Sequence, residues 1–263
     1  MAGQNKSEVA PVNGKWATII LAAGKGTRMH SPLAKVLHEI QGRTILSYPL
    51  ELAINIGSEM IIMVVGHQAE HIRESVVQGG VIFVNQEQQL GTGHAIWQTR
   101  EVLQDFGGSV LILCGDVPLL RLSTIHEMTE IHFRKGASIT VLTALLDNPS
   151  GYGRIVKDSH NNVMKIVEER DATDDEKKIT EINTGIYCAQ STFLFESVEQ
   201  IDNRNAQKEY YLTDIFEIAR NRKAKVISMT VNDHREAMGI NTLNDLEVAN
   251  RIMTERSGYN RPI

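Results

Sequence analysis

The sequence predicts an α/β fold in which a mainly parallel sheet is flanked by helices. Short, continuously apolar runs that are typical of buried strands alternate with segments whose apolar residues recur at helical spacing. Strands separated by helices of this length imply right-handed crossover connections, which place helices on both faces of a parallel sheet. After residue 148 the rhythm changes to short β-like segments. We expect these to form a smaller β-containing lobe folded onto a Rossmann-like core.

The individual elements follow from the same patterns. Before residue 148, strands are expected at 16–21, 60–65, 81–84, 109–114 and 138–145, and helices at 45–56, 68–77, 93–103 and 123–135, the last with a Ser-Thr cap. After it, β-like segments are expected at 153–157, 163–168, 181–189 and 225–231, a charged loop or helix at 171–178, and helices at 192–200, 212–221 and 243–256. No linker rich in Pro, Gly or Ser divides the chain, so we expect one domain over 16–256, preceded by a disordered leader at 1–15 and followed by a tail at 257–263.

Composition and charge exclude several classes of protein. Apolar residues make up 42% and charged residues 22% of the chain, and the longest apolar runs are far too short to span a bilayer. The formal net charge of −5 argues against a nonspecific nucleic-acid binder, and the nine histidines show no metal-ligand spacing such as HExxH. Because the opening residues lack the apolar core of a signal peptide, we expect a cytoplasmic protein with Cys114 and Cys188 reduced and buried.

A glycine-rich loop, LAAGKGTRM at 21–29, directly follows the first strand. Gly24 and Gly26 can take positive φ and bring backbone N–H groups close to phosphate oxygens, and Lys25 and Arg28 add positive charge. The loop matches neither GxxxxGK[ST] nor GxGxxG. Taken alone, it is equally consistent with a tight strand-to-helix turn. Lys35 is a second candidate phosphate ligand whose alternative is a solvated surface lysine.

Asp116 is the first candidate metal ligand, because it directly follows the strand expected at 109–114. A carboxylate at the carboxyl end of a central strand is well placed to bind Mg²⁺ carried by nucleotide phosphates. The alternative is a turn-forming residue two positions before Pro118. Asn241 could supply a second oxygen ligand, or it could simply be the residue at which the last helix begins.

Nine sequence motifs together indicate one protein family. They are LAAGKGTRM (21–29), KVLH (35–38), QLGTGHA (89–95), GDVPLL (115–120), GYGRIV (151–156), IVEERDA (166–172), EINTGIY (181–187), NAQKEYYLTD (205–214) and GINT (239–242). In this order and spacing they resemble the uridyltransferase domain of the bifunctional GlmU proteins, which belong to the sugar nucleotidyltransferases. The resemblance runs from about residue 16 to about residue 253.

The resemblance implies a fold, a reaction and a cofactor. The fold is that of the nucleotide-diphospho-sugar transferases, with nucleotide bound by 16–148 and sugar bound by 149–240, a segment that then returns to the core. The reaction makes UDP-N-acetylglucosamine, a peptidoglycan precursor used in cell wall biogenesis, and pyrophosphate from UTP and N-acetylglucosamine 1-phosphate, with Mg²⁺ as cofactor. The alternatives are a related transferase that uses another nucleoside triphosphate, and a catalytically silent nucleotide-sugar-binding module.

The resemblance also assigns roles to individual residues. Arg28 and Lys35 would neutralise the triphosphate, and Asp116 and Asn241 would hold Mg²⁺. The nucleotide would be bound by Leu21, Ala22, Ala23, Gly24, Gln86, Gly91, Thr92 and Gly115, and the sugar by Tyr152, Gly153, Glu168 and Asn183. Because a phosphate monoester is already an anionic nucleophile, the reaction needs no dedicated general base.

The sequence departs from the family pattern in two ways. Ala34 stands where the family usually has proline before the lysine of KVLH, which predicts a looser loop around Lys35. The sequence also ends at Ile263, without the left-handed β-helix that carries acetyltransferase activity in GlmU. Acetyl transfer is therefore not expected of this chain.

Overall fold

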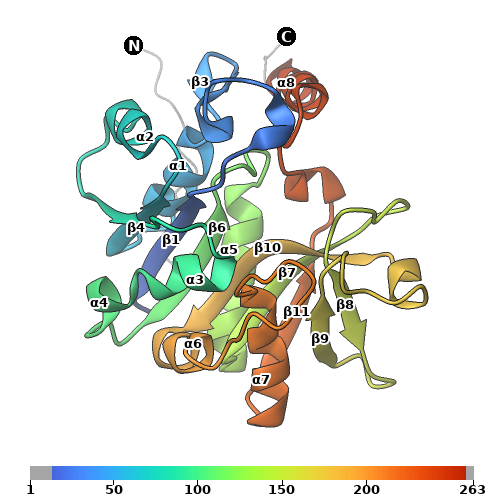
Figure 1. Ribbon diagram of the computed structural model, residues 1–263. Coiled ribbons are helices and arrows are strands. Elements are labelled where there is room, and N and C mark those ends of the chain that lie inside the picture. The colour runs from blue at the N-terminus through green and yellow to red at the C-terminus, as the bar shows by residue number, and fades with distance from the viewer. Residues whose placement is uncertain (1–13, 259–263) are drawn as a thin grey trace.

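The computed structural model describes residues 14–258 and is organised around one large mixed sheet with helices on both faces (Figure 1). Its strands are β1 (Trp16–Ala22), β4 (Met60–Val65), β5 (Val81–Asn85), β6 (Ser109–Cys114), β7 (Ile139–Leu145), β8 (Arg154–Lys157), β9 (Val163–Val167), β10 (Glu181–Gln190) and β11 (Val226–Thr230). The order across the sheet is β11-β7-β10-β6-β1-β4-β5. Apart from β10, which runs antiparallel to both neighbours, the strands on this path pair in parallel.

The helices are short except for α5 and α8. They are α1 (Ser47–Asn55), α2 (Ala69–Ser75), α3 (Thr92–Trp97), α4 (Arg100–Leu103), α5 (Leu122–Lys135), α6 (Ser191–Val198), α7 (Ile215–Asn221) and α8 (Leu243–Gly258). Single 3-10 turns lie at η1 (Thr27–Met29), η2 (Lys35–Leu37), η3 (Glu176–Lys178), η4 (Leu212–Asp214) and η5 (His234–Ala237). None of the helices in residues 14–258 is long and apolar enough to cross a membrane.

The strands are buried on both sides because apolar side chains project from both faces of the sheet. Ile20 and Met63 point into a core that α1, α2 and α5 cover, whereas Ile19 and Ile62 point into a second core under α3, α6 and α7. A third, smaller cluster packs α8 against the loops at one edge of the sheet and includes the buried side chain of Met29. These layers confirm the predicted α/β fold with a mainly parallel sheet flanked by helices.

β8 and β9 form an antiparallel pair that extends the sheet where Arg154 of β8 pairs with Ile182 of β10. This pair stands to one side of the main layers (Figure 1). β10 leads from it back into the centre of the sheet, between β7 and β6. The small lobe and the core therefore share a continuous strand.

The structure corrects several local predictions. The helix expected at 93–103 is two helices, α3 and α4, and a two-stranded hairpin, β2 (Glu39–Ile40) with β3 (Arg43–Thr44), was not predicted. The predicted Ser-Thr cap of α5 is wrong, because the helix begins at Leu122 and neither side chain caps it. At the chain ends, α8 continues to Gly258, while residues 1–13 of the expected leader and 259–263 of the expected tail lie outside the described residues.

Candidate active site

The glycine-rich loop leaves β1 at the edge of the sheet where the parallel strands β1, β4, β5 and β6 all end. A Cβ on Gly24 would meet no atom within 4 Å, so this part of the loop faces open space. Gly26 has φ +60°, and a Cβ there would lie 2.6 Å from the Cβ of Lys35. Only glycine allows this approach, which brings the loop against Lys35. Met29 anchors the far end of the loop in the core below α8.

A cleft of about 380 Å³ opens in front of this loop. Of the eight residues predicted to bind nucleotide, seven line it: Leu21, Ala22, Ala23, Gly24, Gln86, Gly91 and Thr92. The eighth, Gly115, lies beneath them with its N–H donating to the carbonyl of Leu21 at 2.9 Å. Gln89 and Glu209 also line the cleft, although the sequence reasoning gave them no role. Both lie within the motifs that carried the resemblance.

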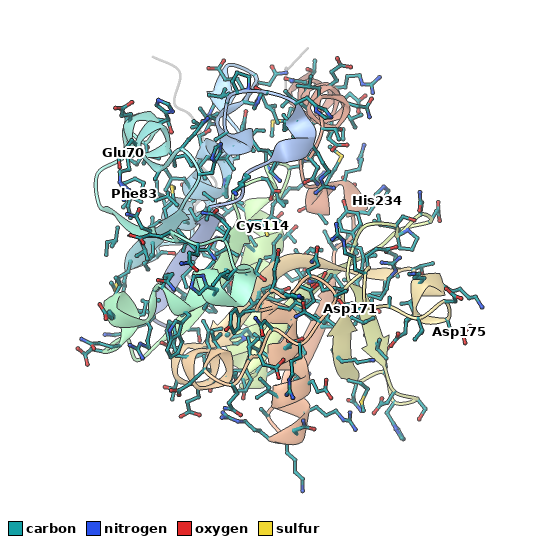
Figure 2. The ribbon with its side chains drawn as sticks, in the orientation of Figure 1. Glu70, Phe83, Cys114, Asp171, Asp175 and His234 are labelled. Atoms are coloured by element: carbon teal, nitrogen blue, oxygen red, sulfur yellow. The ribbon has the colours of Figure 1, made fainter. Side chains whose placement is uncertain are left out.

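Cys114 forms part of the same cleft, at the end of β6 near the centre of the molecule (Figure 2). Its thiol contacts the carbonyl of Gly185 at 3.4 Å, and burial raises its pKa to about 12. Cys188 is buried as predicted, whereas Cys114 is half-buried, and both are free thiols. A thiol with so high a pKa is a poor nucleophile, so we assign it no chemistry.

The four residues predicted to hold phosphates and metal converge beside the cleft. Lys35 forms an ion pair with Asp116, and its Nζ also donates to Oδ1 of Asn241 at 3.0 Å. The guanidinium of Arg28 donates to the same oxygen at 2.9 Å. The side-chain oxygens of Asp116 and Asn241, which are more than a hundred residues apart in the sequence, therefore both contact the ammonium of Lys35.

Topology explains why Asp116 and Asn241 meet. β6 and β11 both end at this edge of the sheet, and the N–H of Ile240 donates to the carbonyl of Asp116 at 2.9 Å. The last helix is capped by Thr242 and Asp245, which exchange backbone and side-chain hydrogen bonds in a capping box. Asn241 precedes this cap, so its side chain is free to meet Arg28 and Lys35.

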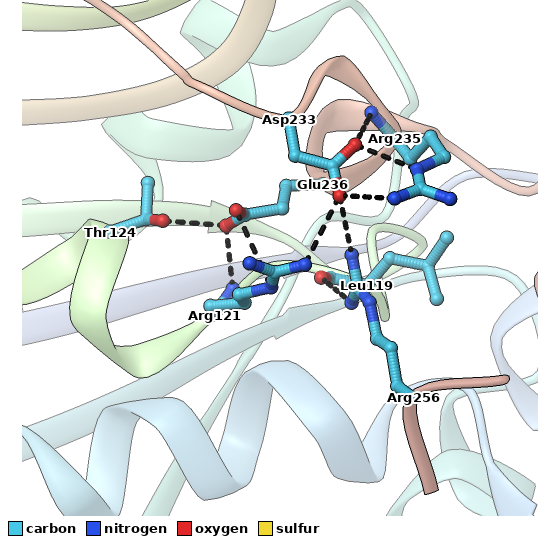
Figure 3. A network of polar contacts seen from close by, with 7 residues as sticks. All are labelled: Leu119, Arg121, Thr124, Asp233, Arg235, Glu236 and Arg256. Carbon is cyan, nitrogen blue, oxygen red and sulfur yellow. Dashed lines mark hydrogen bonds and ion pairs between the residues drawn. The ribbon is translucent and has the colours of Figure 1, made fainter. Parts of the chain in front are cut away.

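A charged network fixes the two segments behind these oxygens (Figure 3). Glu236, only 2% exposed, accepts from the backbone N–H of Arg121 at 3.0 Å and from the hydroxyl of Thr124 at 2.6 Å. It thereby caps α5 in place of the predicted Ser-Thr cap. Asp233 pairs with Arg121 at 3.1 Å, and Arg256 of α8 donates to the carbonyl of Leu119 at 2.7 Å. The network ties the loop after Asp116 to the segment before Asn241.

The loop that carries Lys35 is held by a side chain from outside it. Gln68 accepts from the N–H of Ala34 at 2.8 Å, and its amide nitrogen donates to the carbonyl of Pro32. Ala34 has φ −55°, which is within the range that proline would impose. These contacts oppose the loosening that alanine at position 34 predicted.

The residues predicted to bind sugar gather where the small lobe joins the core. A Cβ on Gly153 would lie 3.4 Å from Oε2 of Glu168 and 3.5 Å from the Cβ of Asn183. Glu168 accepts from the hydroxyl of Thr213 at 3.0 Å, and burial raises its pKa. The pKa of Tyr152 is also raised, first by burial and then by Asp245 and Asp116. Tyr152 is thus close enough to the carboxylates of Asp245 and Asp116 to be affected by their charge.

Comparison with known proteins shows the family to which the chain belongs. The chain matches the Nucleotidyl transferase family over residues 17–246. It is 48% identical over 243 residues to "Bifunctional protein GlmU" of Geotalea daltonii, covering 92% of this chain and 53% of that protein. It is 50% identical over 226 residues to the protein of that name from Geobacter sulfurreducens, covering 86% of this chain and 48% of that protein. The chain therefore spans about half the length of these curated relatives.

The fold recurs in a solved structure. A UDP-glucose pyrophosphorylase complexed with UDP-glucose aligns with a TM-score of 0.72 at 17% sequence identity, covering 92% of this chain and 99% of that one. At this identity the likeness concerns the fold alone. The family match covers most of the sequence, and the chain belongs to the nucleotidyl transferase family.

Proposed function

We propose that this chain is a uridyltransferase that joins UTP to N-acetylglucosamine 1-phosphate, forming UDP-N-acetylglucosamine and releasing pyrophosphate. The convergence of Arg28, Lys35, Asp116 and Asn241 beside the nucleotide cleft is the observation that carries this proposal. The similarity to proteins named GlmU and the sugar-site motifs support the choice of substrates.

The proposed nucleotide subsite is the cleft in front of the glycine-rich loop. The small side chains of Ala22 and Ala23 leave room for a nucleoside at the end of β1. Backbone N–H groups of the loop would meet the phosphates, because Gly24 leaves their approach open. Gln86 and the loop at Gly91 would read the uracil ring, whose carbonyl and N–H groups need polar partners.

The oxygens of Asp116 and Asn241 fit a magnesium ion. They face a shared cation already, the ammonium of Lys35, and both are the hard oxygen donors that Mg²⁺ prefers. Mg²⁺ commonly binds through one or two protein oxygens together with substrate phosphates. When bound, the ion would neutralise phosphate charge.

The task of the protein is to bring two polyanions together. The α-phosphate of UTP would be attacked in line by a phosphate oxygen of the sugar phosphate. A new P–O bond forms as the bond between the α-phosphorus and its bridging oxygen breaks, and pyrophosphate leaves with that electron pair. Arg28 and Lys35 would offset the repulsion between the substrates and stabilise the charge that develops.

The proposed sugar subsite is formed by Gly153, Glu168 and Asn183. Glu168 would accept from a sugar hydroxyl, and the amide of Asn183 would pair with the N-acetyl group. Tyr187 supports that amide, because its hydroxyl contacts the nitrogen of Asn183 at 2.7 Å and the oxygen at 3.0 Å. An unmatched sugar would leave these polar groups unpaired, at a cost of about 1–3 kcal/mol each.

The test is pyrophosphate release on mixing the chain with UTP, Mg²⁺ and N-acetylglucosamine 1-phosphate. Turnover with UTP but not with dTTP, CTP or GTP is expected, and preference for a non-uridine nucleotide would reject the proposed substrate. No release with UTP binding intact would instead favour a binding module. Arg28→Ala and Asp116→Ala should each slow turnover by about a hundredfold, the effect of losing one electrostatic stabiliser. Arg43→Ala, which removes an exposed arginine paired with Glu51, is the control.

A further inference from the structure

The carboxamide of Gln86 is held in one orientation by two neighbours. Its amide nitrogen donates to the carbonyl of Gly91 at 3.0 Å and lies 3.1 Å from Nδ1 of His94. The side chain of Gln86 is only 3% exposed, yet it lines the nucleotide cleft. The amide oxygen has no partner among residues 14–258, so it remains available to a ligand in the cleft.

The carbonyl of Gly91 fixes which end of the Gln86 amide is the nitrogen, because a carbonyl oxygen can only accept a hydrogen bond. Nδ1 of His94 must then accept from the same nitrogen, which requires a neutral imidazole that carries its proton on Nε2. Burial lowers the pKa of His94 more than the backbone carbonyl of Gln88 raises it, which favours the neutral ring.

The other ring nitrogen agrees with this tautomer once Gln98 is oriented to match. Nε2 of His94 lies 3.1 Å from the side-chain amide of Gln98. The nitrogen of that amide is placed only by a 3.4 Å contact to the backbone carbonyl of His94, which is weaker than the 3.0 Å contact that orients Gln86. Amide oxygen and nitrogen are interchangeable in shape, so with the Gln98 amide turned end for end its oxygen would accept from Nε2–H.

We propose that His94 is a positioning residue that fixes the oxygen of the Gln86 carboxamide toward the nucleotide base and so makes the site select uracil over cytosine. The proposal rests on the proposed function, because it takes the cleft at Gln86 to be the base subsite. His94 itself lies behind Gln86, in a groove that it shares with Trp97 and Tyr210.

The orientation of the Gln86 amide distinguishes the two bases because uracil and cytosine differ at ring position 3. Uracil carries an N–H at ring position 3, and a fixed amide oxygen can accept from it. Cytosine carries an unprotonated nitrogen there, which the oxygen of Gln86 would repel. Thymine has the same N–H as uracil, so the orientation of Gln86 cannot separate UTP from dTTP. A change in His94 should therefore alter selection against CTP and leave selection against dTTP alone.

Two variants of the full chain test the proposal. His94→Phe keeps a flat ring but removes the acceptor at Nδ1, and then only the bond to Gly91 opposes rotation of the Gln86 amide. The ratio of UTP to CTP affinities, measured by calorimetry, should fall by about five- to tenfold, which corresponds to one neutral hydrogen bond. The ratio of UTP to dTTP affinities should stay unchanged. His94→Asn, whose amide oxygen can take the place of Nδ1, should restore the UTP-to-CTP ratio.

The proposal is overturned if His94→Phe keeps the wild-type ratio of UTP to CTP, if both nucleotide ratios fall together, or if His94→Asn loses as much as His94→Phe. The tautomer of His94 can also be tested on the wild-type chain, so this test does not depend on the folding of a variant. NMR with ¹⁵N-labelled histidine should show His94 protonated on Nε2, and protonation on Nδ1 would overturn the tautomer argument.

Binding measurements also separate this proposal from the proposed reaction. A wild-type chain that prefers UTP to CTP but releases no pyrophosphate would reject the reaction and leave the role of His94 standing. A chain that releases pyrophosphate while its His94 variants bind all three nucleotides as the wild type does would reject only the role of His94.

Discussion

Replacing Lys35 with methionine should change metal binding and turnover in opposite directions. In the structure the ammonium of Lys35 stands against both oxygens proposed to bind Mg²⁺, in an ion pair with Asp116 and at 3.0 Å from Asn241. A divalent cation that takes the same oxygens has to displace this ammonium. Methionine keeps an unbranched apolar stem that ends one atom short of the ammonium, so it removes the charge and with it the competitor.

The size of the effect follows from the burial of the pair. The side chains of Lys35 and Asp116 are 15% and 23% exposed, so water screens their attraction only in part. A charged hydrogen bond in such a setting contributes about 1.5–3 kcal/mol. Removing it should tighten metal binding without nucleotide by about one to two orders of magnitude. Turnover with UTP should still fall by about a hundredfold, because the cation facing the phosphates is lost.

The assay is Mn²⁺ binding to the nucleotide-free chain, followed by electron paramagnetic resonance, beside pyrophosphate release under saturating metal. Lys25→Met is the matched control, since Lys25 lines the same cleft but is exposed and forms no ion pair with Asp116. It should leave Mn²⁺ affinity almost unchanged. Weaker or equal Mn²⁺ binding by Lys35→Met would refute the view that the ammonium and the metal share Asp116 and Asn241.

Three further predictions concern stability and are measured by urea unfolding. Gly91→Ala should lower the free energy of unfolding by about 3 kcal/mol or more, because φ is +105° and the new Cβ would lie 2.6 Å from the carbonyl oxygen of Tyr210. Gly57→Ala, at φ +77° in open space, is the control and should lower it by only about 1 kcal/mol. Equal losses would contradict this reasoning. Asp214→Asn should stabilise the chain by about 1 kcal/mol at pH 7.5 and not at pH 4. Burial, followed by the charge of Asp202, raises the pKa of this half-buried carboxyl in the folded chain to about 6, so its ionisation costs stability progressively as pH rises from its ordinary pKa through 6. Equal stabilisation at both pH values would show that ionisation is not the cause. Glu236→Leu should lower the free energy of unfolding by about 3 kcal/mol, because it leaves Arg121 and Thr124 without their buried acceptor. Glu236→Gln keeps one accepting oxygen and should lower it by about 1 kcal/mol. A glutamine variant as unstable as the leucine variant would show that the charge of Glu236, and not its hydrogen bonds, stabilises the fold.

The strands were predictable because their burial on both faces leaves continuous apolar runs in the sequence. β1 and β6 are such runs, and the residues after them, Gly24 and Asp116, were placed at one edge of the sheet by topology rules alone. The hairpin of β2 and β3 escaped prediction because two residues per strand carry no periodicity.

Other features depend on contacts between distant parts of the chain. The cap of α5 comes from Glu236, which is 112 residues from Thr124 and belongs to a different element. No local pattern marks such a partner, and the adjacent serine and threonine offered a cap that the helix does not use. The break between α3 and α4 at Gln98 and Thr99 has no proline or glycine to signal it.

Within the candidate site, the sequence left two interpretations of Asn241, a metal ligand or the residue at which the last helix begins, and a neighbouring motif bears on the second. Thr242 and Asp245 cap α8, so Asn241 is not needed at the start of that helix. Its side-chain oxygen instead meets Arg28 and Lys35. The sequence contained this capping box, which assigns the start of the helix to Thr242 and Asp245 rather than to Asn241.

Ala34 shows how a departure from a family pattern can be compensated at a distance. Proline at this position would hold φ near −65° and donate no hydrogen bond. Ala34 has φ −55° and donates to Gln68, whose own amide nitrogen donates to Pro32 two residues earlier. The bond therefore holds the backbone in the conformation that a proline ring would impose covalently, and it does so from the residue that precedes α2. The orientation of Lys35 in this chain consequently depends on the packing of α2, a dependence that proline at position 34 would reduce.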